Sequence, residues 1–187
     1  ALGAALVHMV AGLALRRAPP AHTQELKGLR GKAEALRGEL EELMRRDSEA
    51  YAAVDRALKL PKGTPEEKEA RRRALQAALK EAAQVPLKTG EAASAVLELC
   101  LRLLDRCPPV AHSDLASGAV LAWAGLTGAL YNVDANCLSI KDPLFLTKLA
   151  EQRVGLEKQG RERLTKLREE LEPALSAWLS LLGEARQ

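Results

Sequence analysis

Asp47 is the residue whose setting in this sequence most suggests chemistry. It lies in a segment whose apolar residues are three and four positions apart, which is the spacing of one face of an α-helix: Leu26, Leu29, Ala33, Leu36, Leu40, Leu43, Tyr51, Val54 and Leu58. The same spacing places Asp47 on that face. An apolar setting raises the pKa of a carboxyl group toward neutrality, where it can both accept and release protons. Asp47 is therefore a candidate acid-base residue. The competing interpretation is an acid that pairs with an arginine or lies at the edge of the apolar face.

A second polar pattern lies on one face of a helix near the middle of the chain. Its members are spaced by four and three positions: Asp114, Gly118, Ala122, Gly125, Ala129, Asn132 and Asn136. The small residues favour close packing of two helices. Asn132 and Asn136 are the only asparagines in the sequence, and buried amides need hydrogen-bond partners from the protein or from a ligand. Interhelical hydrogen bonds and ligand binding both remain open for them.

The composition predicts one all-α domain. The chain has 187 residues, only 3% of them aromatic, and is dominated by the helix formers Ala, Leu, Glu, Arg and Lys. Its 28 basic and 25 acidic residues are interleaved, which is typical of solvated helix faces and not of a nucleic-acid-binding surface. The three cysteines, Cys100, Cys107 and Cys137, suit buried thiols in a reducing cytoplasm.

Two apolar segments could be mistaken for targeting or membrane signals. Residues 1–15 have no basic region before them and no cleavage pattern after them, so we interpret them as a helix whose upstream sequence is missing. Residues 115–133 carry no charge, but they are rich in Ala, Gly, Ser and Thr. We expect a helix buried by other helices and no membrane span.

Capping residues and prolines divide the chain into helices. Thr23 is a candidate N-cap, Thr64 and Pro65 are expected to start a helix, and Pro86 is expected to kink or break that helix. The predicted segments are residues 1–17, 23–59, 64–104, 113–140 and 142–183. They predict a bundle of about five long antiparallel helices with short connections.

Metal-binding motifs are not evident. His8, His22 and His112 are scattered, and the sequence has no H-E-x-x-H or C-x-x-C motif. His112 is of interest only because it adjoins Ser113 and Asp114.

Five stretches of the sequence resemble those of a known family. They are "ALGAALVHMV" at 1–10, "DSEAYAAVDRALKLPKGTPEEK" at 47–68, "VPL" at 85–87, "HSDLASGA" at 112–119 and "GALYNVDANCLSIKD" at 128–142. In this order they resemble the formiminotetrahydrofolate cyclodeaminase and methenyltetrahydrofolate cyclohydrolase family, which includes the cyclodeaminase domain of formiminotransferase-cyclodeaminase. The resemblance covers nearly the whole chain and implies a single cyclodeaminase-like helical domain over residues 1–187.

The resemblance also implies the site. Asp47 matches the acid of a D-x-E-A-[FY] motif and would be the catalytic residue. The implied substrate-binding residues match other polar positions of the family motifs: Lys62, His112, Ser113, Asp114, Asn132 and Asn136. The implied protein is a cytoplasmic homodimer that binds a folate, with no metal and no cofactor beyond the tetrahydrofolate substrate. A formiminotransferase domain or subunit is a further implied partner. The family's Pro-Gly-Gly-Gly-Ser segment precedes the point where this sequence starts.

The implied reaction is conversion of 5-formiminotetrahydrofolate to 5,10-methenyltetrahydrofolate with release of ammonia. One carboxyl group could take the proton from N10 and deliver it to the departing nitrogen. The methenyltetrahydrofolate cyclohydrolase reaction needs the same acid-base catalysis, so the sequence leaves both activities open. A noncatalytic folate-binding or assembly dimer is the third alternative.

Overall fold

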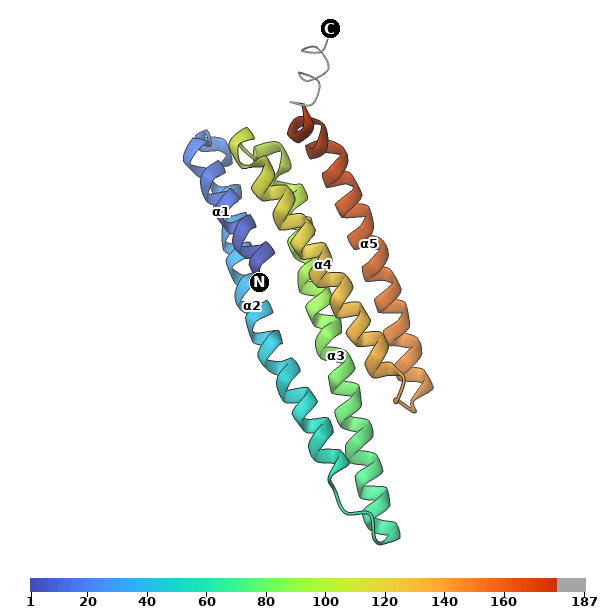
Figure 1. Cartoon of the computed structure of the whole chain (residues 1–187). Helices are drawn as coiled ribbons and strands as arrows, with labels where there is room; N and C mark the ends of the chain where they lie inside the picture. Colours follow the sequence, from blue (N-terminus) through green and yellow to red (C-terminus); the bar gives the residue numbers. More distant parts are fainter. Residues whose placement is uncertain (178–187) are drawn as a thin grey trace.

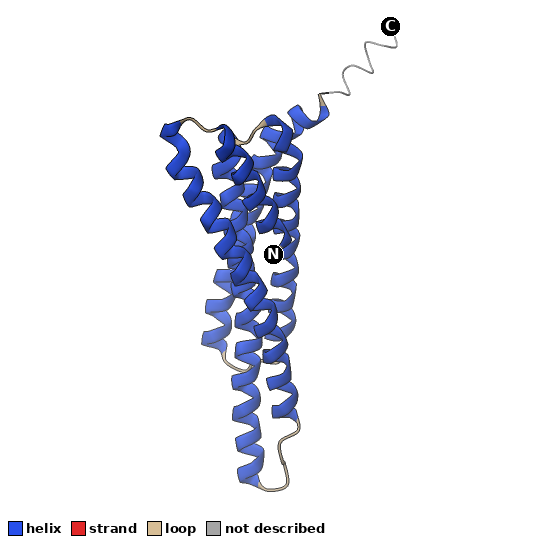
Figure 2. Cartoon of the chain, turned by 90° about the vertical axis from the view of Figure 1, so that its left-hand side faces the viewer, coloured by secondary structure: helices blue, strands red, loops and turns tan. Residues whose placement is uncertain are grey.

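The fold is all-α, as predicted. A computed structural model describes residues 1–177, which form five α-helices and two short 3-10 turns, and no β-strand occurs in this range (Figures 1 and 2). The helices are α1 (Leu2–Arg17), α2 (Pro20–Leu58), α3 (Pro65–Leu103), α4 (His112–Cys137) and α5 (Pro143–Ser176), with the 3-10 turns Leu104–Arg106 and Pro109–Ala111 between α3 and α4. The part of the last predicted segment beyond residue 177 lies outside the described residues.

The starts of α3 and α5 follow local sequence signals, whereas no side chain caps the starts of α1, α2 and α4. Thr64 accepts a hydrogen bond from the backbone N–H of Glu67, and the Glu67 side chain accepts one from the backbone N–H of Thr64, which together form a capping box at the start of α3. Asp142 caps α5 by accepting from the Phe145 N–H. Thr23 was wrong as an N-cap. α2 already begins at Pro20, whose fixed φ suits the first helical position, and the Thr23 hydroxyl donates to the Pro19 carbonyl.

Pro86 does not break α3, contrary to one of the two outcomes expected from the sequence. The helix is assigned without interruption from Pro65 to Leu103, and Pro86 is buried within it. Proline removes the helical donor to the carbonyl of residue 82. Asn136 of α4 donates to that Ala82 carbonyl instead, at 3.0 Å.

The central helix is α3, which packs against the four others. α1 lies over α2 and α4 and covers one half of the groove between them, so that its N-terminus lies midway along the bundle (Figure 1). α2 and α3 extend beyond the turn between α4 and α5 as a protruding hairpin (Figure 1). The main core is formed by residues of all five helices, including Val7, Leu29, Leu97, Leu115 and Leu167.

Small residues bring α1 and α4 into close contact. A Cβ on Gly3 would lie 2.8 Å from the Gly118 carbonyl oxygen, and a Cβ on Gly118 would lie 3.4 Å from the Gly3 carbonyl oxygen. The small residues predicted to permit close packing do so here. α4, which contains the uncharged span 115–133, is buried on one side by α1, α3 and α5. Among the described helices, none is long and apolar enough to cross a membrane.

Candidate active site

The groove between α2 and α4 opens into a cleft at the point where α1 begins. The cleft has a volume of about 300 Å³ and is bounded by the first turn of α1, by α2 and α4 as walls and by α3 as the floor. Its lining residues are Ala1, Leu2, Gly3, Ala4, Leu40, Glu41, Met44, Thr89, Ala93, Val96, Leu121, Ala122 and Gly125.

Two interactions with α3 place Asp47 and Asn136 at the same level of the bundle. Arg46, the neighbour of Asp47 on α2, forms an ion pair with Glu81 at 2.8 Å. Asn136 on α4 donates to Ala82, the next residue of α3. The structure therefore brings the predicted catalytic residue and one predicted substrate-binding residue to the same turn of α3.

Asp47 is exposed, and its predicted burial on the apolar face is wrong for the single chain. After Leu43 the buried side of α2 continues through Ala50 and Ala57, a spacing of seven residues. Asp47 falls instead on the side that carries Met44 and Tyr51, whose residues are 71% and 76% exposed. The cleft-lining Met44 is three positions before Asp47, so the carboxylate lies about one turn from the cleft on the same side of the helix.

The Asp47 carboxylate has no hydrogen bond or ion pair to any other side chain in residues 1–177. Each neighbouring arginine has another partner: Arg45 pairs with Glu42 and Glu49, and Arg46 pairs with Glu81. The alternative in which Asp47 serves as the structural partner of an arginine is therefore not found in the described part of the chain. The group is free to interact with a ligand.

The two asparagines differ in their surroundings. Asn136 is half-buried, and its amide group also donates to the Asn132 carbonyl at 2.9 Å, so protein atoms occupy it. The interhelical hydrogen bond considered for it is confirmed. Asn132 is exposed, and its amide group donates to Gly128 O within its own helix at 3.2 Å. Its side-chain oxygen has no partner within residues 1–177 and is available to a ligand.

His112, Ser113 and Asp114 lie at the opposite end of α4 from the asparagines. Asn132 follows Asp114 by enough helix to separate them by about 27 Å along the axis. Ser113 is not the N-cap of α4, because that position is Ala111 and no side chain caps it. Asp114 lies in the first turn, where its charge complements the helix dipole. Burial, together with the nearby Asp114 carboxylate, raises the pKa of the Cys107 thiol to about 11.

Lys62 lies in the turn between α2 and α3, at the tip of the protruding hairpin, and is exposed. α2 alone continues for about 17 Å beyond Asp47 before this turn begins. A single chain thus places Asp47, Asn132 and Asn136 at one level, with Lys62 and the His112–Asp114 group remote from them. None of the cleft-lining residues was predicted as a site residue, although Ala122 and Gly125 lie on the small-residue face identified in the sequence. Met44 shares the helical face of Asp47, which is the signal that could have identified it.

The structure superimposes on formiminotetrahydrofolate cyclodeaminase from Thermotoga maritima with a TM-score of 0.81 and 26% identity, covering 93% of this chain and 85% of that one. Its fold is therefore that of a cyclodeaminase. The family described as Formiminotransferase-cyclodeaminase matches residues 1–154. The chain belongs to this family, and the prediction of an enzyme of the cyclodeaminase or cyclohydrolase kind is confirmed.

Relatives of both kinds are similar in sequence. The chain is 35% identical to methenyltetrahydrofolate cyclohydrolase of Methylorubrum extorquens over 157 residues, which is 83% of this chain and 76% of the relative. It is 37% identical to formimidoyltransferase-cyclodeaminase of Mus musculus over 150 residues, which is 79% of this chain and 28% of the relative. The chain therefore spans most of the first protein but less than a third of the second.

Proposed function

We propose that this protein converts 5-formiminotetrahydrofolate to 5,10-methenyltetrahydrofolate and ammonia, as a lyase in which Asp47 is the acid-base group. The observation that carries the proposal is the Asp47 carboxylate itself, which lies beside the cleft without a protein partner although arginines flank it on α2. A carboxylate that served only stability at this position would be expected to pair with one of those arginines.

Asp47 has two successive tasks in this reaction. N10 of the folate attacks the carbon of the protonated formimino group on N5 (N5–CH=NH2⁺), and Asp47 accepts the proton that N10 loses. The resulting tetrahedral intermediate carries the former imino nitrogen as an amine. Asp47 returns the proton to this nitrogen as its bond to carbon breaks, which releases ammonia and leaves the methenyl ring. The carboxylate is regenerated, and the step requires no external oxidant or reductant. Such acid-base assistance typically contributes about a hundredfold to ten-thousandfold in rate.

A second copy of the chain is part of this proposal. Exposed apolar side chains lie on the helices near Asp47, beside its charged neighbours: Met44 and Tyr51 on α2, Leu2 on α1 and Tyr131 on α4. The exposed face of α4 between Ser117 and Asn132 carries no charge. Contact between two such faces would remove water from Asp47 and create the apolar setting that raises a carboxyl pKa.

The homodimer also offers a physical reason for the remote predicted residues. Lys62 and the group His112, Ser113 and Asp114 lie too far from Asp47 to meet one small ligand within a single chain. A partner chain in a different orientation would bring its own copies of these residues toward Asp47 of the first. In that arrangement Asn132 and Asp47 bind the reacting part of the folate from one chain. Lys62 of the second chain would attract the negative charge of the glutamate tail.

Cyclohydrolase activity is the second candidate function. It is favoured by the extent of similarity to the Methylorubrum extorquens protein, most of whose length this chain spans. In this reaction Asp47 would take a proton from the water that adds to the methenyl carbon. A formiminotransferase domain or subunit remains a proposed partner for the cyclodeaminase alternative, given the names of the mammalian relatives.

The test compares both substrates with two matched variants. The wild-type protein is mixed separately with 5-formiminotetrahydrofolate and 5,10-methenyltetrahydrofolate, and methenyl absorbance and ammonia are followed. Asp47→Asn should remain folded and lose about a hundredfold or more in rate. Asp105→Asn, at an exposed position in the 3-10 turn that follows α3, should keep the wild-type rate. Folate binding without turnover of either substrate would replace the proposal with the noncatalytic binding dimer.

A further inference from the structure

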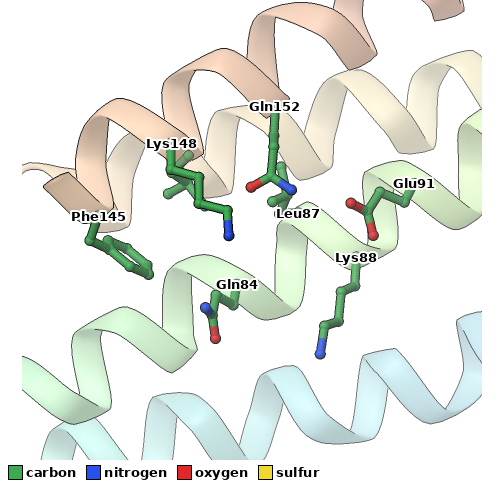
Figure 3. A pocket seen from close by; sticks show the side chains of 8 residues that line it. Gln84, Leu87, Lys88, Glu91, Phe145, Lys148 and Gln152 are labelled. Atoms are coloured by element: carbon green, nitrogen blue, oxygen red, sulfur yellow. The ribbon is translucent and has the colours of Figure 1, made fainter.

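A separate cavity lies on the side of α3 that faces α5. An ion pair joins the α3 and α5 sides of the contact at each end of this cavity. Lys80 pairs with Asp142 at 2.6 Å, and Arg163 pairs with Glu98 at 3.0 Å. Between them the two helices leave a cavity of about 250 Å³ (Figure 3). This volume is smaller than the usual cavity for a drug-sized ligand, so it suits a small molecule.

The cavity combines an apolar floor with a polar rim. Leu87 and Leu149 are buried beneath it, and the ring of Phe145 forms one wall. The Phe145 ring is held by Lys80, whose ammonium lies 5.4 Å from the ring centroid. The polar lining residues are Gln84, Lys88 and Glu91 from α3 and Lys148 and Gln152 from α5.

The polar side chains at this rim have no partners within the described part of the chain. None of the five polar side chains has a hydrogen bond or ion pair with another residue in the described range. This contrasts with the paired charges above and below. In Figure 3, Lys148 and Gln152 extend from α5 over the floor, and the Glu91 carboxylate faces this space from α3. Lys148 and Glu91 thus lie on the same cavity as opposite charges, yet they do not form an ion pair.

We propose that this cavity binds a free α-amino acid with an apolar side chain. Its carboxylate would lie at Lys148 and its ammonium group at Glu91, so that each end of the zwitterion meets the opposite charge. Gln84 and Gln152 each offer both a donor and an acceptor to the same polar groups. The ligand side chain would lie on Leu87, Leu149 and Phe145.

Phe145 provides a local reporter because it is the only phenylalanine in the sequence. Replacing it biosynthetically with 4-fluorophenylalanine in the full chain puts a single fluorine on the cavity wall. The ligands are L-leucine, 4-methylpentanoate, which lacks the ammonium group, and isopentylamine, which lacks the carboxylate. We expect L-leucine to shift the fluorine signal saturably and to bind more tightly than either analogue.

Charge-neutralising variants assign the two ends of the ligand. Lys148→Gln should weaken L-leucine binding by a factor of about two to five and leave isopentylamine unaffected or tighter, because these groups are exposed to solvent. Glu91→Gln should also weaken L-leucine binding but strengthen binding of 4-methylpentanoate. Lys158→Gln, at an exposed position of α5 that does not line the cavity, is the matched control and should change none of the affinities.

The proposal is overturned by a fluorine signal that L-leucine does not shift saturably. It is also overturned if Lys148→Gln and Glu91→Gln bind all three ligands as the wild-type protein does. Because the readout is ligand binding beside Phe145 and not folate turnover, its outcome is independent of the activity proposed for Asp47.

Discussion

The carboxamide of Asn136 donates a 3.0 Å hydrogen bond to the carbonyl oxygen of Ala82 on the neighbouring helix. In a regular helix this carbonyl would accept from the N–H of residue 86, but residue 86 is a proline and has none. An asparagine of α4 therefore supplies the donor that a proline removes from α3. This interaction also fixes the register of α4 on α3 beside the candidate site.

Replacing Asn136 tests this relationship. We expect Asn136→Ala to lower the free energy of unfolding by about 1–3 kcal/mol, because it leaves the Ala82 carbonyl without a partner. In a Pro86→Ala background the new N–H of residue 86 engages this carbonyl, so the same Asn136 substitution should cost less. Urea unfolding of the wild-type protein, the two single variants and the double variant measures the coupling free energy between positions 136 and 86. An equal cost in both backgrounds would contradict the assignment.

The close approach of α1 and α4 gives a second prediction. Gly3→Ala places a Cβ 2.8 Å from the Gly118 carbonyl, and the helices must separate to admit it. We expect a loss of about 1–3 kcal/mol in the free energy of unfolding. Gly28→Ala is the control, because its Cβ would meet nothing within 4 Å, and it should stabilise α2 by up to about 1 kcal/mol. Thermal unfolding that ranks the two variants in the reverse order would rule out a tight contact at Gly3.

The proposed dimer face can be disrupted without touching the cleft lining. Tyr131 is 66% exposed on α4, and Tyr131→Lys should raise the dimer dissociation constant by about tenfold or more. Activity should fall with the dimer population and recover at protein concentrations that restore the dimer. Val154→Lys introduces the same charge at an exposed position of α5 and should leave association unchanged. Sedimentation of fully active wild-type protein as a monomer would refute the dimeric site.

The N-terminal end of α5 is expected to respond to acid. Hydrogen bonds from Lys80 and from the Phe145 backbone N–H lower the pKa of Asp142 below its ordinary value of 3.8. A carboxyl group whose pKa is lower in the folded state stabilises the fold above its unfolded pKa, and this stability is lost as the pH falls through the folded pKa. Asp142→Asn should therefore be less stable than wild type at neutral pH. The difference should disappear on acidification below the ordinary value, as measured by urea unfolding across that range. A constant difference at all pH values would indicate that the charge has no part in it.

The sequence predicted the helices well because their signals are local. The Thr64-Pro65 start of α3 and the Asp142-Pro143 start of α5 depend on a few neighbouring residues, and both occur where predicted. Pro86 shows the limit of local reasoning. Its effect on α3 depends on Asn136, which lies 50 positions later in the sequence and on another helix. Only tertiary packing could reveal this dependence.

The candidate site was predicted less completely for a similar reason. Apolar spacing places Asp47 near the buried face of α2. A helix has slightly more than three and a half residues per turn, so the buried face rotates slowly around the helix axis. At the level of Asp47 the buried face is formed by Ala50 and Ala57. Spacing alone cannot distinguish a helix face that packs within the chain from one that packs against another molecule. Tyr51 belongs to the apolar face in the sequence and is exposed in the structure.

The protruding hairpin has a consequence for hydrogen exchange. Gln76 is the last residue of α3 toward the tip that holds the α4–α5 turn, through bonds to Ser139 and Lys141, and beyond it α2 and α3 have mainly each other (Figure 1). A pair of helices without a third element opens locally more often than the centre of a bundle. Amide protons should therefore exchange faster from Gln76 toward the tip. The same local opening lets the backbone at Lys62 sample several positions, while the backbone at Asp47 is held in one.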